Sequence, residues 1–273
     1  MKLGAVVRNM GPQSTRETVL GCAQAAEAAG LDEIWVVDHV AIPPDDAEGS
    51  GGRYLDPLAT LAWLAGATQR IGLGTAVLIL PYRPALPTAK SVATIQELSA
   101  GRLRLGVGVG WMRPEFQALG IERSRRGRIT DETLAFLHRC FESDEVEANG
   151  QHFLFKPRPA RPPIFVGGAP PHALARAAAL GDGWMPMGGS PEDLAPHATR
   201  LAELFAERGR SAPEMVVMTG LPLDDPPRAA ELARAYRDAG ATRLATGSRY
   251  ADAAQFERDA ERLADVAAAL REA

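Results

Sequence analysis

An acidic residue and a histidine stand side by side at Asp38 and His39, directly after the apolar run IWVV. Histidine titrates near neutral pH and donates a proton in either tautomer, so His39 suits proton transfer or a hydrogen bond to a ring oxygen. Barrel enzymes place ionisable groups of this kind where a strand ends. The pattern leaves a second interpretation open, in which the pair only organises the loop that follows.

Glycines recur at alternate positions of the run LGVGVGW, at Gly106, Gly108 and Gly110. Glycine weakens a strand, so three together predict that another group approaches this backbone closely. The spacing is GxGxG rather than the dinucleotide fingerprint GxGxxG, and Pro114 interrupts any helix that would open from the last glycine. A Rossmann-type site is therefore disfavoured.

A second glycine motif, VGGAPP, places Gly167 and Gly168 just before a predicted helix. Backbone N–H groups at the start of a helix lie at the positive end of its dipole and bind anions. The pattern favours a phosphate site over a plain strand-to-helix turn.

One stretch, Met112–Arg128, combines a carboxylate with a run of cations. Glu115 is a candidate acid or base, and Arg113, Arg123, Arg125, Arg126 and Arg128 surround it in sequence. Such a run is usually a solvated surface, but in a net acidic chain it also suits an acidic ligand tail. The histidines and cysteines have no metal-ligand spacing, so no metal site is expected.

These residues lie between elements that alternate regularly. Eight short apolar runs read as parallel strands buried on both faces, and helical stretches separate them. The predicted strands are Lys2–Val7, Glu33–Asp38, Ile71–Ile79, Arg102–Val107, Pro163–Val166, Gly183–Met187, Glu214–Thr219 and Thr242–Thr246. The pattern predicts an α/β fold with a single (β/α)8 TIM barrel over residues 1–273, and an open doubly wound sheet is the alternative.

The helix ends carry recognisable signals. Ser14 with Glu17 predicts a capping box for a helix over Thr15–Ala29. An N-cap oxygen followed by proline occurs at Asp56-Pro57, Ser190-Pro191 and Asp225-Pro226. Left-handed glycines are predicted to end helices at Gly30, Gly101, Gly181 and Gly240.

Composition narrows the class of protein. The formal net charge of −4 over 273 residues argues against a nucleic-acid surface. No apolar run approaches the ~20 residues of a membrane span. Cys22 and Cys140 lie far apart in helix-like segments, so we expect reduced thiols and a cytoplasmic protein.

Five segments in order resemble the luciferase-like monooxygenase superfamily, in particular its F420-dependent oxidoreductase branch. They are AAEAAGLDEIWVVDHV, RIGLGTAVLILPYRP, LSAGRLRLGVGVGW, RPPIFVGG and ARAAALGDGW, and AYRDAGATRLAT follows near the end. The first five span roughly Ala25–Trp184, and their shared order makes chance agreement improbable. The resemblance implies a bacterial-luciferase-like barrel.

The resemblance also assigns roles to residues. It implies that Asp38 and His39 are catalytic groups near the redox ring of a cofactor, whereas Glu115 is a catalytic candidate from the residue pattern alone. It implies that Ala76 and Val77 form a strand bulge with a cis peptide behind that ring. The remaining implied contacts are Gly108, Gly110 and Trp111 over the ring, Gly167 and Gly168 at the phosphate, and Asn9, Trp111 and Trp184 around a substrate.

The function implied is hydride transfer between coenzyme F420 and a small organic substrate. The alternative is an FMN-dependent monooxygenase that uses O2 and a partner flavin reductase, and a barrel that only carries the cofactor is a third reading. The sugar-phosphate dehydrogenases of the superfamily have Glu where this chain has Trp111, which argues against that activity. No long lid is evident after the seventh strand, and a homodimer is consistent with the family.

Overall fold

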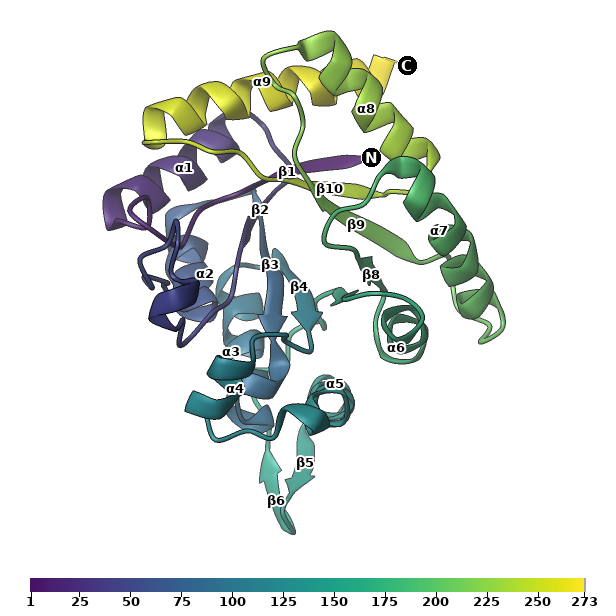
Figure 1. Ribbon diagram of the computed structural model, residues 1–273. Helices are drawn as coiled ribbons and strands as arrows, with labels where there is room; N and C mark the ends of the chain where they lie inside the picture. The colour runs from purple at the N-terminus through teal and green to yellow at the C-terminus, as the bar shows by residue number, and fades with distance from the viewer. Residues whose placement is uncertain (273) are drawn as a thin grey trace.

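A computed structural model describes residues 1–272, and its centre is a closed barrel of eight parallel strands (Figure 1). Around the barrel the order is β1-β10-β9-β8-β7-β4-β3-β2. The barrel strands are β1 (Lys2–Val6), β2 (Glu33–Val36), β3 (Gly72–Ile79), β4 (Leu103–Gly108), β7 (Ile164–Gly167), β8 (Gly183–Met185), β9 (Glu214–Thr219) and β10 (Arg243–Thr246). Each predicted strand is present, so the TIM barrel is confirmed and the open sheet is excluded.

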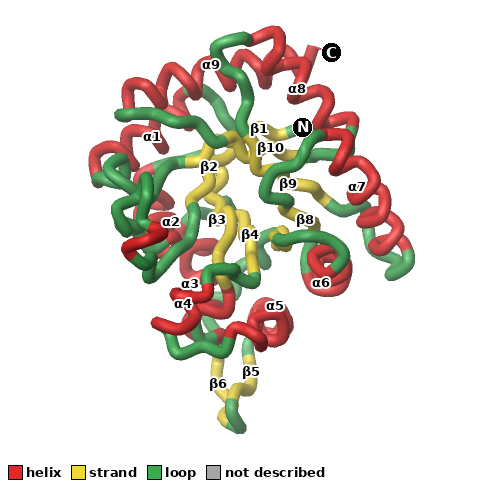
Figure 2. Tube along the Cα trace, in the orientation of Figure 1, coloured by secondary structure: helices red, strands yellow, loops and turns green. Residues whose placement is uncertain are grey.

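Helices surround the strands and run over the outside of the barrel (Figure 2). The helices are α1 (Arg16–Ala28), α2 (Pro57–Ala67), α3 (Ala85–Leu98), α4 (Arg113–Ala118), α5 (Arg126–Glu142), α6 (His172–Leu180), α7 (Pro191–Ala206), α8 (Pro226–Asp238) and α9 (Ala253–Glu272), with short 3-10 turns η1 (Pro44–Asp46), η2 (Leu80–Tyr82) and η3 (Arg123–Arg125). Within the described residues, no helix is both long and apolar enough to cross a membrane.

Most helix ends follow the predicted signals. Asp56, Ser190 and Asp225 each cap a helix that has proline at its first position. The capping box at Ser14 is wrong: Thr15 is the N-cap of α1 and accepts a hydrogen bond from the Thr18 amide.

One further helix end differs from its prediction. Gly30, Gly101 and Gly240 have positive φ as expected, but Gly181 is extended. A Cβ at Gly181 would lie 2.9 Å from Val166 Cγ2, so close packing rather than a left-handed turn requires glycine there.

The hairpin of β5 (Glu145–Ala148) and β6 (Gln151–Leu154) was not predicted. It projects from the barrel beyond α5 (Figure 1). Asn149 and Gly150 form its turn and both have positive φ, as the Asn-Gly signal of a tight hairpin requires. The alternation of polar and apolar residues in EVEANGQHFL was the sequence signal for it.

The barrel interior changes character along its axis. At the amino ends of the strands, Arg243 is ion-paired with Glu33 and Glu214, and Arg104 also pairs with Glu33. Above this layer is an apolar one that includes Trp35, Phe165, Met185 and Val216. The carboxyl ends of the strands are therefore separated from the charged layer by packed side chains.

Candidate functional site

The predicted site residues after three strands lie at one end of the barrel. Asp38 follows β2, Gly108 ends β4 and Gly167 ends β7. Because all eight strands are parallel, these positions share the carboxyl-end mouth, where this fold builds its sites. The predicted juxtaposition is confirmed.

Asp38 is buried, and its two oxygens are already occupied by the protein. It accepts a hydrogen bond from the Ile79 amide at 2.8 Å and two from the Arg83 guanidinium, at 2.6 and 2.9 Å. Arg83 also reaches Asp56 at 2.8 Å. Asp38 thus ties the end of β2 to the end of β3 and to α2, which is the organising role that the sequence left open.

His39 differs from Asp38 because only one of its two ring nitrogens is hydrogen-bonded to a described residue. Nδ1 lies 2.8 Å from Oε2 of Glu115, and 17% of the side chain is exposed. The ring packs edge-on against Tyr54 and Trp111, with centroid separations of 5.1 and 6.2 Å. These contacts fix the imidazole at the mouth with Nε2 as its remaining polar atom.

Glu115 is fully buried under the loop after β2. Its Oε1 accepts from the amides of Val40 and Ala41, and Tyr82 donates its hydroxyl to Oε2 at 2.9 Å. Burial raises the pKa of Glu115, but the hydrogen bonds from His39, the two amides and Tyr82 outweigh it and lower the pKa to about 2. Glu115 is therefore an ionised acceptor near neutral pH, which does not fit the proton-donating role considered from sequence.

The bulge expected in β3 is present. The strand register shifts between Thr75 and Leu78, and the Ala76–Val77 peptide is cis. A Cβ on Gly108 would lie 2.5 Å from Val77, and one on Gly167 would lie 2.9 Å from it. The group that approaches these two glycines is thus the Val77 side chain of the protein itself.

Gly106 is explained in the same way. A Cβ there would lie 2.1 Å from the Thr75 carbonyl oxygen and 2.7 Å from the Met185 sulfur. The alternating glycines of β4 leave room for groups of the neighbouring strand β3. Together with Val77 they form the floor of the mouth.

A cavity of about 340 Å³ opens beside the second glycine motif. Its lining includes Gly167, Gly168 and Ala169, the first residues of α5 and the first residues of α6. Neither helix has a side-chain cap at its N-terminus, so the positive ends of both helix dipoles lie at this cavity. The amides of Arg126 and Ala173 bond the carbonyls of Arg123 and Ala169.

One cation in this cavity has an unsatisfied donor. Arg126 is the first residue of α5; its Nη1 donates to the Arg123 carbonyl at 3.1 Å, whereas its Nε is buried without a hydrogen bond to any described residue. Arg176 also lines the cavity but is already paired with Asp131. A buried donor without a partner, between two uncapped helix starts, fits a bound phosphate group.

The arginine loop divides into two parts. Arg113 and Arg123 line a neighbouring cavity of about 500 Å³, which shares Ser124 and Arg126 with the first. Arg128 instead points to solvent and pairs with Glu132 at 2.6 Å. Arg125 lines neither of these two cavities. Only part of the predicted cationic group therefore lies where an acidic tail could extend from a phosphate.

Two residues assigned to a substrate pocket lie elsewhere. Asn9 is fully buried, and its side chain bonds the backbone of Val37 and Leu55. Trp184 is 2% exposed in the outer core, and its indole N–H donates to the Gly168 carbonyl at 2.8 Å. Both expectations are wrong, because these side chains hold the loops of the site from behind.

Trp111 and Gly110 remain at the mouth. The Trp111 side chain is 64% exposed and stands beside His39, as a wall of the site would. Gly110 has φ of 74°, and a Cβ there would lie 2.8 Å from Ile79. The sequence analysis did not predict a role for Arg8 or Tyr82. The available signal for Arg8 was its position directly after the first predicted strand.

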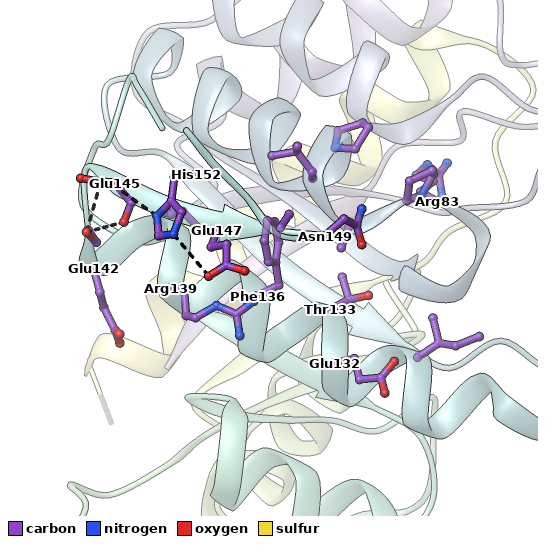
Figure 3. A pocket seen from close by; sticks show the side chains of 18 residues that line it. Arg83, Glu132, Thr133, Phe136, Arg139, Glu142, Glu145, Glu147, Asn149 and His152 are labelled. Carbon is purple, nitrogen blue, oxygen red and sulfur yellow. Dashed lines mark hydrogen bonds and ion pairs between the residues drawn. The ribbon is translucent and has the colours of Figure 1, made fainter. Parts of the chain in front are cut away.

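A cavity larger than these two lies outside the barrel. It measures about 1340 Å³ and is lined by Arg83 and Pro84 before α3, and by α3, α5 and the β5–β6 hairpin. Figure 3 shows His152 between Glu145 and Glu147, whose carboxylates lie 3.3 and 3.6 Å from its ring nitrogens. These side chains are exposed to solvent, and the cavity is not at the barrel mouth.

Comparison with protein families and curated proteins gives consistent matches. The model of a family described as luciferase-like monooxygenase matches residues 3–273. An uncharacterised protein of Mycobacterium tuberculosis is 31% identical over 277 residues, covering 90% of this chain and 94% of the relative.

Two named relatives differ in cofactor. An F420-dependent hydroxymycolic acid dehydrogenase of Mycobacterium tuberculosis is 32% identical, over 63% of this chain and 49% of its own. An FMNH2-dependent dimethylsulfone monooxygenase of Pseudomonas fluorescens is also 32% identical, over 63% of this chain and 48% of its own.

Solved structures share the fold at low identity. A monooxygenase from Streptomyces bottropensis superposes with a TM-score of 0.82 at 19% identity, covering 100% of this chain and 99% of that one. An F420-dependent secondary alcohol dehydrogenase superposes with a TM-score of 0.79 at 16% identity, covering 96% and 97% of the two chains.

Proposed function

Since the chain belongs to the luciferase-like monooxygenase family, whose relatives include F420- and FMN-dependent oxidoreductases, we propose that it is an F420-dependent oxidoreductase acting on a small organic substrate. The observation that carries the choice of cofactor is the pair of adjoining cavities at Arg126. One suits a phosphate, and the other continues from it past Arg113 and Arg123. F420 has an oligoglutamate tail beyond its phosphate, whereas FMN ends at its phosphate.

The residues of the first cavity fit the phosphate of either cofactor. The amides after Gly167 and Gly168, the uncapped starts of α5 and α6, and Arg126 would hold it. Trp184 fixes the Gly168 carbonyl from the outer side and so keeps the turn in place. Val77 would form the floor on which a flat ring rests.

His39 would move the substrate proton. Bound F420 would exchange a hydride with the substrate at C5 of its ring. Because ionised Glu115 accepts the Nδ1 proton, Nε2 is the ring atom of His39 that would accept a hydroxyl proton as a carbonyl forms. In the reverse direction, protonated His39 returns that proton. Glu115 is thus a positioning residue, and Trp111 would exclude water beside the reacting centre.

The cofactor choice is tested by titrating the protein with F420 and with FMN at low and high ionic strength. We expect F420 to bind more tightly and its advantage to shrink as salt rises, because salt screens exposed charges. Replacing Arg113 and Arg123 together by Gln should cost F420 about tenfold in affinity and leave FMN unaffected.

The matched control replaces Arg125 and Arg128 together by Gln, which changes the net charge equally but removes no cavity lining. This variant should bind F420 as the parent does. Equal binding of FMN and F420 at every salt concentration would overturn the choice and favour the FMN-dependent monooxygenase with its partner reductase.

A further inference from the structure

Arg8 has no part in the chemistry proposed so far, although it stands at the barrel mouth. Val6 packs inside the barrel with Trp35, and Val7 packs in the outer core. Side chains alternate along a strand, so Arg8 leaves from the inner face, above Val6. Its Nη2 lies 3.6 Å from the position that a Cβ on Gly11 would take.

The guanidinium of Arg8 lacks the partners that other inward-facing arginines have. Arg104 and Arg243 are both paired with Glu33, whereas the Nε of Arg8 is buried without a hydrogen bond to any residue of 1–272. The buried Oε1 of Gln13, in the same loop, has no partner among the described residues either, and it is an acceptor beside the Arg8 guanidinium. Burying an unpaired donor costs free energy, so the Nε of Arg8 indicates a ligand that offers an acceptor.

The strands beside Arg8 leave room for such a ligand. Ala245 of β10 and Met218 of β9 face the interior, so alternation puts Gly247 and Gly220 on the inner face at the mouth. A Cβ on Gly247 would meet no heavy atom within 4 Å. A Cβ on Gly220 would meet only the Gly247 carbonyl, at 3.6 Å.

Several large apolar side chains are exposed at the carboxyl end of the barrel. Val40, Trp111 and Met187 follow β2, β4 and β8, and 52%, 64% and 56% of their surfaces are exposed. Val37 and Met218 are partly buried beneath them against the inner core. Large apolar side chains gathered around one opening mark a site for an apolar ligand.

We infer that the substrate is a largely apolar molecule with one carboxylate, which Arg8 binds through its guanidinium. A guanidinium offers parallel N–H donors that match the two oxygens of a carboxylate. The apolar remainder would pack against Trp111 and Met187. This inference rests on the proposed function in one respect, namely that the substrate binds at this mouth beside His39.

The test measures binding directly, by calorimetry, with octanoate and 1-octanol as probes. Both are added to the protein alone and to the protein saturated with F420 or FMN. Arg8→Gln should weaken octanoate binding about ten- to hundredfold and leave 1-octanol and both cofactors unchanged. Arg8→Lys keeps the charge but loses the parallel N–H donors of the guanidinium. Its affinity for octanoate should therefore lie between those of the parent and Arg8→Gln.

Arg208→Gln is the control, because Arg208 is an exposed cation in the connection between α7 and β9, at the opposite end of the barrel, and its loss changes the net charge equally. It should bind octanoate normally. Equal octanoate binding by the parent and Arg8→Gln, no octanoate binding to the parent at millimolar concentration, or a loss of cofactor rather than octanoate affinity in Arg8→Gln would each overturn the inference. If neither cofactor binds the parent, the proposed function fails, while octanoate binding to the protein alone still decides the role of Arg8.

Discussion

At the scale of single residues, the site separates groups that face the ligand from groups that hold them. His39 has one ring nitrogen that is not bonded to a described residue, whereas the carboxylate oxygens of Asp38 and Glu115 accept hydrogen bonds from the protein. A sequence gives the residue types at a strand end but not which carboxylate is already bonded. Whether Asp38 and Glu115 are bonded depends on Arg83 and Tyr82, and each of these lies more than thirty positions from the carboxylate that it contacts.

Removing His39 tests its assignment as the proton-transfer group. His39→Ala should lower turnover about 10²–10⁴-fold. Its melting temperature should fall only slightly, because the side chain is partly exposed. His152→Ala, on the exposed hairpin, is the matched loss of a histidine and should leave turnover unchanged. Near-normal turnover of His39→Ala would return the residue to a purely structural role.

Glu115 makes stability depend on pH in a defined direction. Its pKa is about 2 in the folded protein and ~4.3 in an unfolded chain, so its contribution is complete above the unfolded value and is lost as pH falls toward 2. Glu115→Gln should therefore destabilise the protein by on the order of 3 kcal/mol near neutral pH.

The difference in unfolding free energy between this variant and the parent should shrink as pH falls from about 4.5 to 2. Urea titrations at several pH values measure it. A difference that stays constant over this range would show that Glu115 is not held as an ionised acceptor.

At the scale of elements, local sequence patterns predicted the strands and several helix starts. All eight barrel strands followed from apolar runs, and three of the N-caps followed from an oxygen before proline. The cavity at Arg126 could be predicted only in part. The glycine turn before α6 was visible, but the start of α5 reaches the same cavity from a loop about forty residues earlier, and only the barrel brings the two together.

A negative charge in the glycine turn should compete with a bound phosphate. Gly168 is a poor place for it, because its φ is 121° and a side chain there would strain the backbone. Ala169 lines the same cavity and is exposed. We expect Ala169→Asp to abolish F420 and FMN binding with an unchanged melting temperature.

Ala169→Asn is the control, since it has nearly the same shape without the charge, and it should retain most of the affinity. Fluorescence titration of both variants measures the effect. If Ala169→Asp bound cofactor as tightly as the Asn variant, the phosphate would have to bind elsewhere.

At the scale of the whole molecule, the two ends of the barrel serve different needs. The amino end is closed by Arg243 with Glu33 and Glu214, where burial raises the pKa of Glu33 and the arginines oppose that effect. The carboxyl end carries the site. The apolar layer between them includes Trp35 and Phe165.

Arg243→Met should therefore destabilise the fold without changing cofactor affinity. It leaves Glu33 buried with only Arg104 as a partner, which should cost about 3 kcal/mol in urea unfolding. Adding Glu33→Gln should recover part of the loss, because the fully buried carboxylate is then removed and only the partly exposed Arg104 is left without an ion-pair partner. A change in cofactor affinity equal to the loss of stability would show that the two ends are coupled.

The packing of Val77 between Gly108 and Gly167 separates two kinds of glycine in this site. These two are required by a neighbouring side chain of the chain itself, so selection would preserve them even in a descendant that had lost its cofactor. Arg126 bonds the Arg123 carbonyl through Nη1, but its buried Nε lacks a partner among the described residues, so the ligand is what requires this arginine and it would be free to change in such a lineage. Retained glycines therefore report on the packing of the barrel, whereas a retained Arg126 reports on phosphate binding.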